Sequence, residues 1–139
     1  MSEIKEKTGK ALTFLWMFLT SSIFVYGLVG YVVSQSNQET ERLSDTTLNT
    51  LIVITIMIAV IALIIVPKII KPKEDSHLFG YCLIQWALIE SIAIFGLMSY
   101  YLGGPFSVFI SMLGASVILM VLLLPTSARL KKLLETDII

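Results

Sequence analysis

The stretch CLIQWALIESIAIFGLMSYY, residues 82–101, decides the fold, because it is long and apolar enough to cross a bilayer yet carries a carboxylate near its middle. A membrane-spanning helix needs about 20 predominantly apolar residues to cross a hydrocarbon core of about 30 Å. An acidic side chain at the centre of such a helix costs about 2.5–3.5 kcal/mol to insert, and intramembrane acids are therefore functional candidates by default. Glu90 is the residue whose presence needs an explanation.

The rest of the chain also has the composition of a membrane protein. Of its 139 residues, 56% are hydrophobic and 14% are charged, whereas soluble domains carry about 25% charged residues. We therefore predict an all-α, integral membrane protein with a single transmembrane domain, residues 1–139. Four runs are long enough to span the bilayer, at residues 12–34, 48–67, 78–102 and 105–125.

The charges between these runs predict which side of the membrane each end occupies. Lysine and arginine are enriched in cytoplasmic loops, so both termini and the 67–77 loop are predicted to be cytoplasmic, and we expect a bacterial inner-membrane protein. The formal net charge is zero, which favours the lipid bilayer and not a nucleic acid as the partner. The basic residues at these places are Lys5, Lys7, Lys10, Lys68, Lys71, Lys73, Arg129, Lys131 and Lys132.

Residues 126–139, which follow the last span, allow two predictions. Leu130, Leu133 and Leu134 stand beside lysines, a pattern typical of a short amphipathic helix on the cytoplasmic surface. A disordered tail is the alternative.

Two segments of the chain are similar to each other, which predicts an internal repeat. Placing residues 19–31 (LTSSIFVYGLVGY) over residues 88–100 (LIESIAIFGLMSY) aligns six closely similar positions, among them Gly27 with Gly96. In both cases an apolar helix ending in a proline and a basic segment follows. The chain is therefore predicted to form two antiparallel helical hairpins in tandem, of which only the second carries an acid.

Small residues predict which helix faces pack closely, because glycine and serine let two backbones approach each other in a membrane. A serine hydroxyl on the first span also offers a hydrogen-bonding partner for Glu90. The predicted packing positions are Ser21, Ser22, Gly27 and Gly30 in the first span, Gly96 and Ser99 in the third, and Ser111 and Gly114 in the fourth.

The surroundings of Glu90 resemble the second helix of the ring-forming proteolipid, the c subunit, of rotary F-type and V-type ATPases. That family places a mid-membrane Asp or Glu in an Ala-Leu-x-Glu and Ile-Tyr/Phe-Gly-Leu context after a polar cytoplasmic loop. Here ALIE at residues 87–90, IFGL at 94–97 and KPKED at 71–75 match that context. Four helices with one acid are similar to the duplicated V-type form with one of its two carboxylates lost. The run 48–67 departs from the family, because it contains no glycine.

The resemblance implies that copies of this chain assemble into a homo-oligomeric ring in which Glu90 binds and releases a proton or another cation. A carboxyl group in hydrocarbon stays neutral because its charged form loses hydration, so Glu90 would ionise only at a hydrated or cation-lined contact. The four predicted spans contain no Arg, Lys or His. The resemblance therefore implies a cation-bearing membrane partner.

The alternative prediction is a structural protein, a homo-oligomeric tetraspan scaffold that organises lipid or partner proteins. Glu90 would then be a neutral polar contact between helices, bonded to Ser21, Ser22 or a carbonyl of a neighbouring copy. An enzyme is not expected, because the sequence contains no Walker loop, HExxH or CxxC motif. A single cysteine, Cys82, cannot form a disulfide within the chain or a cysteine-based metal site, and no cofactor or metal is predicted.

Overall fold

The computed structural model describes residues 2–36, 42–71 and 75–135, and every regular element in these ranges is helical. This confirms the predicted all-α class. The elements are α1 (Ser2–Gln35), α2 (Asp45–Val60), a π-helical segment η1 (Ile61–Ile65), α3 (Val66–Ile69), α4 (Asp75–Tyr101), α5 (Phe106–Leu122) and α6 (Ser127–Glu135).

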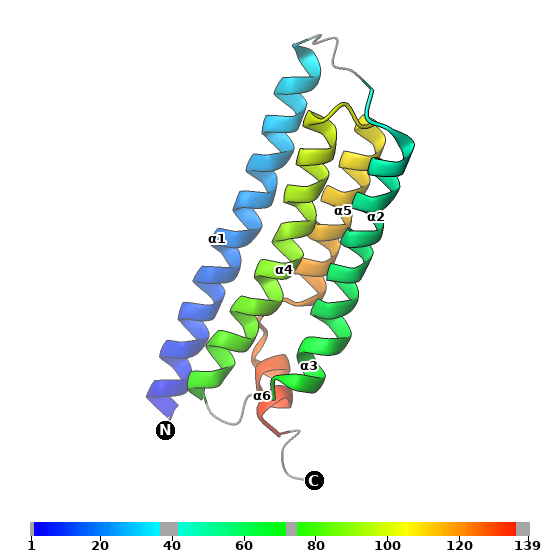
Figure 1. Cartoon of the computed structure of the whole chain (residues 1–139). Coiled ribbons are helices and arrows are strands. Elements are labelled where there is room, and N and C mark those ends of the chain that lie inside the picture. The colour runs from blue at the N-terminus through cyan, green and yellow to red at the C-terminus, as the bar shows by residue number, and fades with distance from the viewer. Residues whose placement is uncertain (1, 37–41, 72–74, 136–139) are drawn as a thin grey trace.

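The long helices run up, down, up and down, so that both ends of the chain lie at the same end of the bundle (Figure 1). Helix α4 is the centre of the bundle and packs against α1, α2 and α5. Accordingly, 44% of its spanning segment is buried, compared with 17% for α1 and 17% for α2. The chain therefore places Glu90 on its most enclosed helix.

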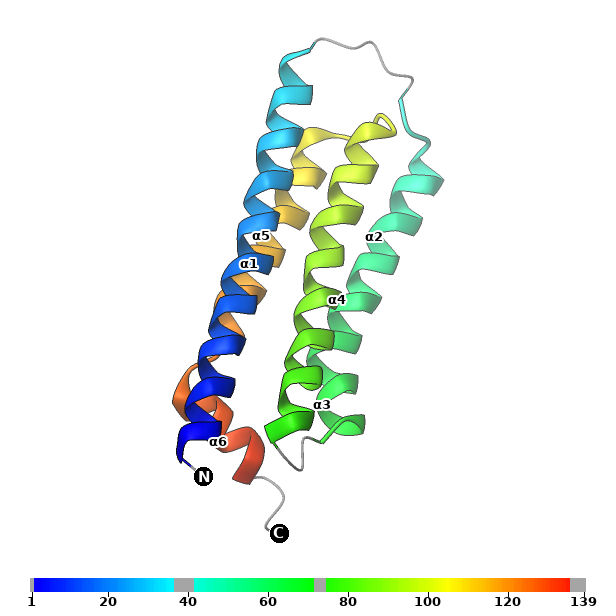
Figure 2. The same cartoon turned by 90° about the vertical axis from the view of Figure 1, so that its left-hand side faces the viewer.

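The predicted pairing of the first two spans is wrong in one respect. Helices α1 and α2 run antiparallel but lie on opposite sides of α4 (Figure 2), and α1 packs against α4 and α5 instead. Of the two predicted hairpins, only the second, α4 with α5, packs as a direct pair within the described residues, and α2 packs against α4 instead of α1. The short turn at 102–105 forces α4 and α5 to be adjacent, whereas residues 36–44 are long enough to join two helices that are not neighbours.

Three helical segments are long and apolar enough to cross a membrane: α1, α2 continued through η1 and α3, and α4. Helix α5 has 17 residues and reaches that length only together with α6, from which it is bent by 79°. The part of the chain that the structure describes thus has three spans, or four when the bent pair is counted. Large side chains such as Phe14, Phe24 and Leu28 point out of the bundle, as expected of a lipid-facing surface.

The boundaries differ from the predicted ones at the first span. Helix α1 begins at Ser2, ten residues before the predicted start, because the polar residues ahead of the apolar run are themselves helical. An ion pair of 2.7 Å between Lys10 and Glu6, one turn apart, supports this extension. The turn between α4 and α5 is tight as predicted, with Gly103 at a φ of 88° that favours glycine.

The segment after α5 forms the amphipathic helix that was one of the two predictions for residues 126–139. Helix α6 covers Ser127–Glu135 and packs back against α4. Its leucines Leu130 and Leu133 contact the buried core of the bundle, while Lys131 and Lys132 are exposed.

Candidate functional site

Glu90 lies between α1 and α4, where two hydroxyl groups of α1 contact it. The Ser22 Oγ is 2.5 Å and the Tyr26 hydroxyl 2.9 Å from the same carboxyl oxygen, Oε1. Ser22 and Tyr26 stand four residues apart, so they share one face of the helix. Their neighbours across the interface, Ile89 and Ala93, are fully buried, whereas Glu90 itself is half-buried. The site is a carboxyl group held by two hydroxyls in an apolar setting.

The hydroxyl groups of this cluster can be arranged with Glu90 either protonated or ionised. A serine hydroxyl has one hydrogen to donate, yet Ser22 Oγ also lies 2.7 Å from the carbonyl oxygen of Leu19. With Glu90 protonated, its hydroxyl donates to Ser22, Ser22 donates to Leu19, and Tyr26 donates to Glu90. Every hydrogen then has one acceptor. With Glu90 ionised, Ser22 turns its hydrogen to the carboxylate and both hydroxyls donate to it.

The cluster contains one carboxyl group and two hydroxyl groups. Among the described residues, no group of three or more His, Cys, Asp or Glu side chains is placed to hold a metal. Hard cations are bound by several oxygen ligands arranged around the ion. Here both hydroxyls lie within hydrogen-bond distance of a single carboxyl oxygen.

Of the predicted packing glycines, three lie at close contacts and one does not. A Cβ atom at Gly27 would lie 2.9 Å from Leu113 Cδ2, and one at Gly96 would lie 2.9 Å from Met112 Cβ. A Cβ at Gly30 would overlap the ring of Phe109. Gly114 has open space beside it, so the packing within this chain does not require a glycine there.

The predicted serines also divide into contacting and outward-facing ones. Ser22 reaches Glu90, and Ser99 is buried and donates to the Gly96 carbonyl at 2.7 Å. Ser21 and Ser111 are exposed, and each donates 2.7 Å back to a carbonyl of its own helix. Ser21 and Ser22 were the two candidate partners of Glu90 on the first span. The rotation of α1 about its axis directs Ser22 toward Glu90 and Ser21 away from the bundle.

A second polar network, which the sequence interpretation missed, lies nearer the termini. Pro67 has no N–H, and the N–H of Val66 bonds to Ile61 in the π-helical segment, so the carbonyl of Ala62 has no donor within its helix. The Gln85 amide donates to that carbonyl at 2.9 Å. Arg129 of α6 in turn donates to the Gln85 oxygen at 2.7 Å. Burial lowers the pKa of Arg129, but an arginine remains charged in proteins.

The end of α5 is capped by side chains from three other helices. Its last carbonyls have no partners within the helix. The Trp16 indole of α1 donates to the Met120 carbonyl at 2.9 Å, and the Trp86 indole of α4 donates to the Leu123 carbonyl at 3.2 Å. Arg129 donates to the same Leu123 carbonyl. These bonds pair the Met120 and Leu123 carbonyl groups where α5 ends.

Replacing Arg129 by leucine is expected to release α6 and to lower the free energy of unfolding by about 1–3 kcal/mol, because the buried Gln85 oxygen loses its donor. Lys131→Leu is the matched control, since Lys131 is an exposed cation on the same helix. Denaturant titration of the detergent-solubilised proteins gives the stabilities, and hydrogen exchange of residues 127–133 reports on α6 docking. Equal stability of the two variants would contradict a role for the Arg129–Gln85 bond.

Comparisons of the chain with protein families, with curated proteins and with solved structures give no match. The resemblance of the Glu90 segment to rotary-ATPase proteolipids therefore stays a prediction. The function has to be argued from the chemistry of the site.

Proposed function

We propose that the protein crosses the membrane four times and binds and releases a proton at Glu90. The observation that supports this most is the pair of hydroxyls on one carboxyl oxygen. Hydroxyl groups can both donate and accept hydrogen bonds, so Ser22 and Tyr26 remain bonded to Glu90 whether it is protonated or ionised. A proton can therefore be gained or lost here without movement of the helices.

The walls of this site are apolar, so proton exchange in this proposal requires that water or a cation reach the Glu90 carboxyl group. Its half-buried position leaves one side of the carboxyl group open to such an approach.

The placement in the membrane follows from the charges at the ends of the bundle. Both ends of the chain and α6 lie at the same end (Figure 1), and this end carries the lysines that the positive-inside rule assigns to the cytoplasm. The fourth span in this arrangement is α5, whose carbonyl groups are capped where it ends. We place the protein in a bacterial inner membrane with both termini in the cytoplasm.

Assembly into a homo-oligomeric ring and a cation-bearing partner belong to the same proposal. Arg129 is directed to Gln85, five residues from Glu90 on α4. A cation that draws a proton from Glu90 would therefore come from a second protein or a neighbouring copy. The outward-facing apolar surfaces of α1 and α2 are the faces available to lipid and to such neighbours.

The second candidate is the structural one, in which Glu90 is a permanent neutral contact in a tetraspan scaffold. It is favoured by the position of both hydroxyl partners on α1 of the same chain and by the central place of α4. Hydrogen bonds of this kind contribute about 0.6 kcal/mol on average in membranes, and up to about 1.7 kcal/mol. In this case the proton never leaves the site.

Labelling with a hydrophobic carbodiimide, which modifies protonated carboxyl groups, separates the two candidates. In protein reconstituted into liposomes, we expect modification at Glu90 that falls as the pH is raised, since proton release removes the reactive form. Mass spectrometry of peptides measures the labelled fraction. Glu6→Gln, which removes an exposed carboxylate far from the site, should leave this profile unchanged. Labelling that does not vary with pH would contradict proton release and support the permanent contact.

A further inference from the structure

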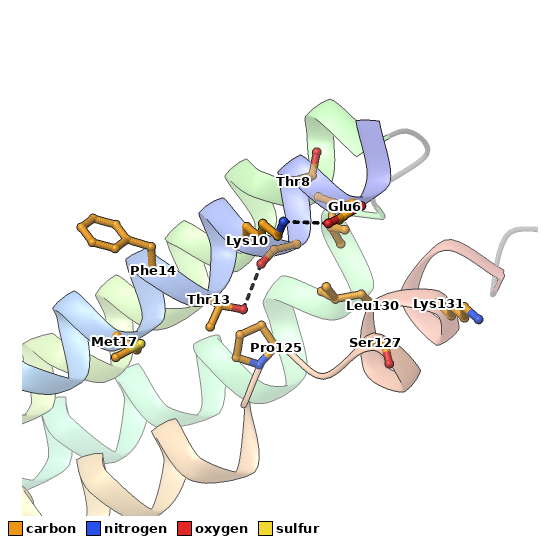
Figure 3. Close-up of a pocket in the computed structure, with 12 residues that line it drawn as sticks. Glu6, Thr8, Lys10, Thr13, Phe14, Met17, Pro125, Ser127, Leu130 and Lys131 are labelled. Atoms are coloured by element: carbon orange, nitrogen blue, oxygen red, sulfur yellow. Dashed lines mark hydrogen bonds and ion pairs between the residues drawn. The ribbon is translucent and has the colours of Figure 1, made fainter. Parts of the chain in front are cut away.

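A cavity separate from the Glu90 site lies between the start of α1 and α6 (Figure 3). Its volume is about 610 Å³, within the range of about 300–1,000 Å³ that small-molecule sites occupy. One part of its lining is apolar, including Phe14, Met17 and Leu130. The other part is polar and includes Lys10 and Lys131.

The cavity lies at the depth where the membrane meets water. Its α1 wall runs from Glu6, in the charged first turns, to Met17, in the apolar run. Pro125, just past the end of α5, lines it from the other side. An occupant would therefore meet both the headgroup layer and the outermost part of the hydrocarbon.

The charges around the cavity favour an anion. The lining contains two lysines and one glutamate, which gives a net charge of +1. Glu6 is used in the ion pair with Lys10. Lys131 is exposed, and the described residues offer it no carboxylate within ion-pair distance.

We propose that this cavity binds one anionic phospholipid of the cytoplasmic leaflet. Its acyl chain lies against Phe14, Met17 and Leu130, and its phosphate faces Lys131. Anionic headgroups attract lysines near the membrane surface. The net positive charge of the lining repels a second copy of this chain end, which is itself basic. The inference rests on the membrane placement and does not depend on proton release at Glu90.

The chain offers a matched pair of glycines for the test. Gly9 lines the cavity, and a Cβ atom at Gly9 would have nothing within 4 Å. Leucine at this position adds an apolar side chain at the cavity wall, and its Cβ atom displaces no protein atom. Gly114 of α5 has the same open surroundings and does not line the cavity, so Gly114→Leu is the control. Lys131→Gln removes the charge and keeps a polar side chain at this position.

Native mass spectrometry of the detergent-solubilised protein, with equimolar dioleoylphosphatidylglycerol and dioleoylphosphatidylcholine added, measures the bound lipid. We expect one retained lipid with a roughly fivefold preference for the anionic one, from the strength of a single lysine at an anionic surface. Lys131→Gln should lose the preference but still retain lipid. Gly9→Leu should lose both lipids, while Gly114→Leu behaves as the wild type. Gel filtration establishes that each variant is folded.

Three results would overturn the inference. Equal retention of the two lipids by the wild type would show that the cavity does not select an anion. Lipid retention by Gly9→Leu at the level of Gly114→Leu would place the bound lipid elsewhere on the protein. A dimer that lacks lipid and disappears only in Gly9→Leu would identify a second copy as the occupant and would equally overturn it.

Discussion

Replacement of Glu90 by glutamine is expected to abolish proton release at the centre of the bundle and to leave the α1–α4 contact in place. Glutamine has the same shape, and its side-chain oxygen, placed where Oε1 lies, can accept hydrogen bonds from both Ser22 and Tyr26. The wild-type protein should show a pH-dependent carbonyl band of a protonated carboxyl group in difference infrared spectra. Glu90→Gln should lack the band and keep the free energy of unfolding within about 0.5 kcal/mol.

Two further variants control this experiment. Glu90→Leu removes the hydrogen bonds together with the proton, and is expected to lower stability by about 0.6–1.7 kcal/mol. Glu6→Gln, an exposed carboxylate at the end of α1, should keep both the infrared band and the stability. A pH-dependent band that persists in Glu90→Gln would assign the exchanging proton to another group. Equal destabilisation by glutamine and leucine would show that the hydrogen bonds do not hold α1 to α4.

The sequence predicted the position of the site but only part of its composition. Glu90 stands out because a charge is rare in an apolar run, and no knowledge of packing is needed to find it. Ser22 was one of two adjacent serines, and only the rotation of α1 against α4 distinguishes it from Ser21. Tyr26 was missed because only the serines of the first span were considered as partners of Glu90. Its i, i+4 relation to Ser22 is the signal from which it follows once α1 is placed beside α4.

The network around Gln85 was less accessible from the sequence. It depends on a π-helical turn, on the N–H that Pro67 lacks and on α6 folding back, and these meet only in three dimensions. Span existence and length follow from hydropathy, because the bilayer imposes both. Which helices pack together cannot be predicted from hydropathy, since neither α1 nor α2 has a sequence feature that fixes its neighbour. The nine residues 36–44 between these helices are long enough to allow either arrangement, so side-chain packing decides between them.

Replacing Gly30 by alanine is expected to destabilise the protein by about 1–3 kcal/mol, because the added methyl group overlaps Phe109. The ring has little room to retreat. Phe109 is fully buried, is stacked on Tyr100 with ring centroids 5.7 Å apart, and lies 5.7 Å from the ring of Phe106. Alanine improves helix propensity by up to about 1 kcal/mol over glycine. The variant is therefore destabilised only if the free-energy cost of the overlap with Phe109 exceeds that gain. Denaturant titration followed by tryptophan fluorescence measures the difference.

The matched control is Gly114→Ala, where the new methyl group meets open space and only the gain in propensity remains. Gly114→Ala should therefore be neutral or slightly stabilising. Combining Gly30→Ala with Phe109→Leu makes room for the methyl group, so the double variant should be less destabilised than the sum of the two single ones.

Strict additivity of these variants would mean that α1 and α5 are not in contact at Gly30. The Glu90 site depends on the same packing, because Ser22 and Tyr26 reach α4 from the helix that carries Gly30. A tolerated Gly30→Ala would therefore also weaken the argument for proton binding. A destabilised variant that is rescued by the smaller residue at 109 would support the α1 placement on which that argument rests.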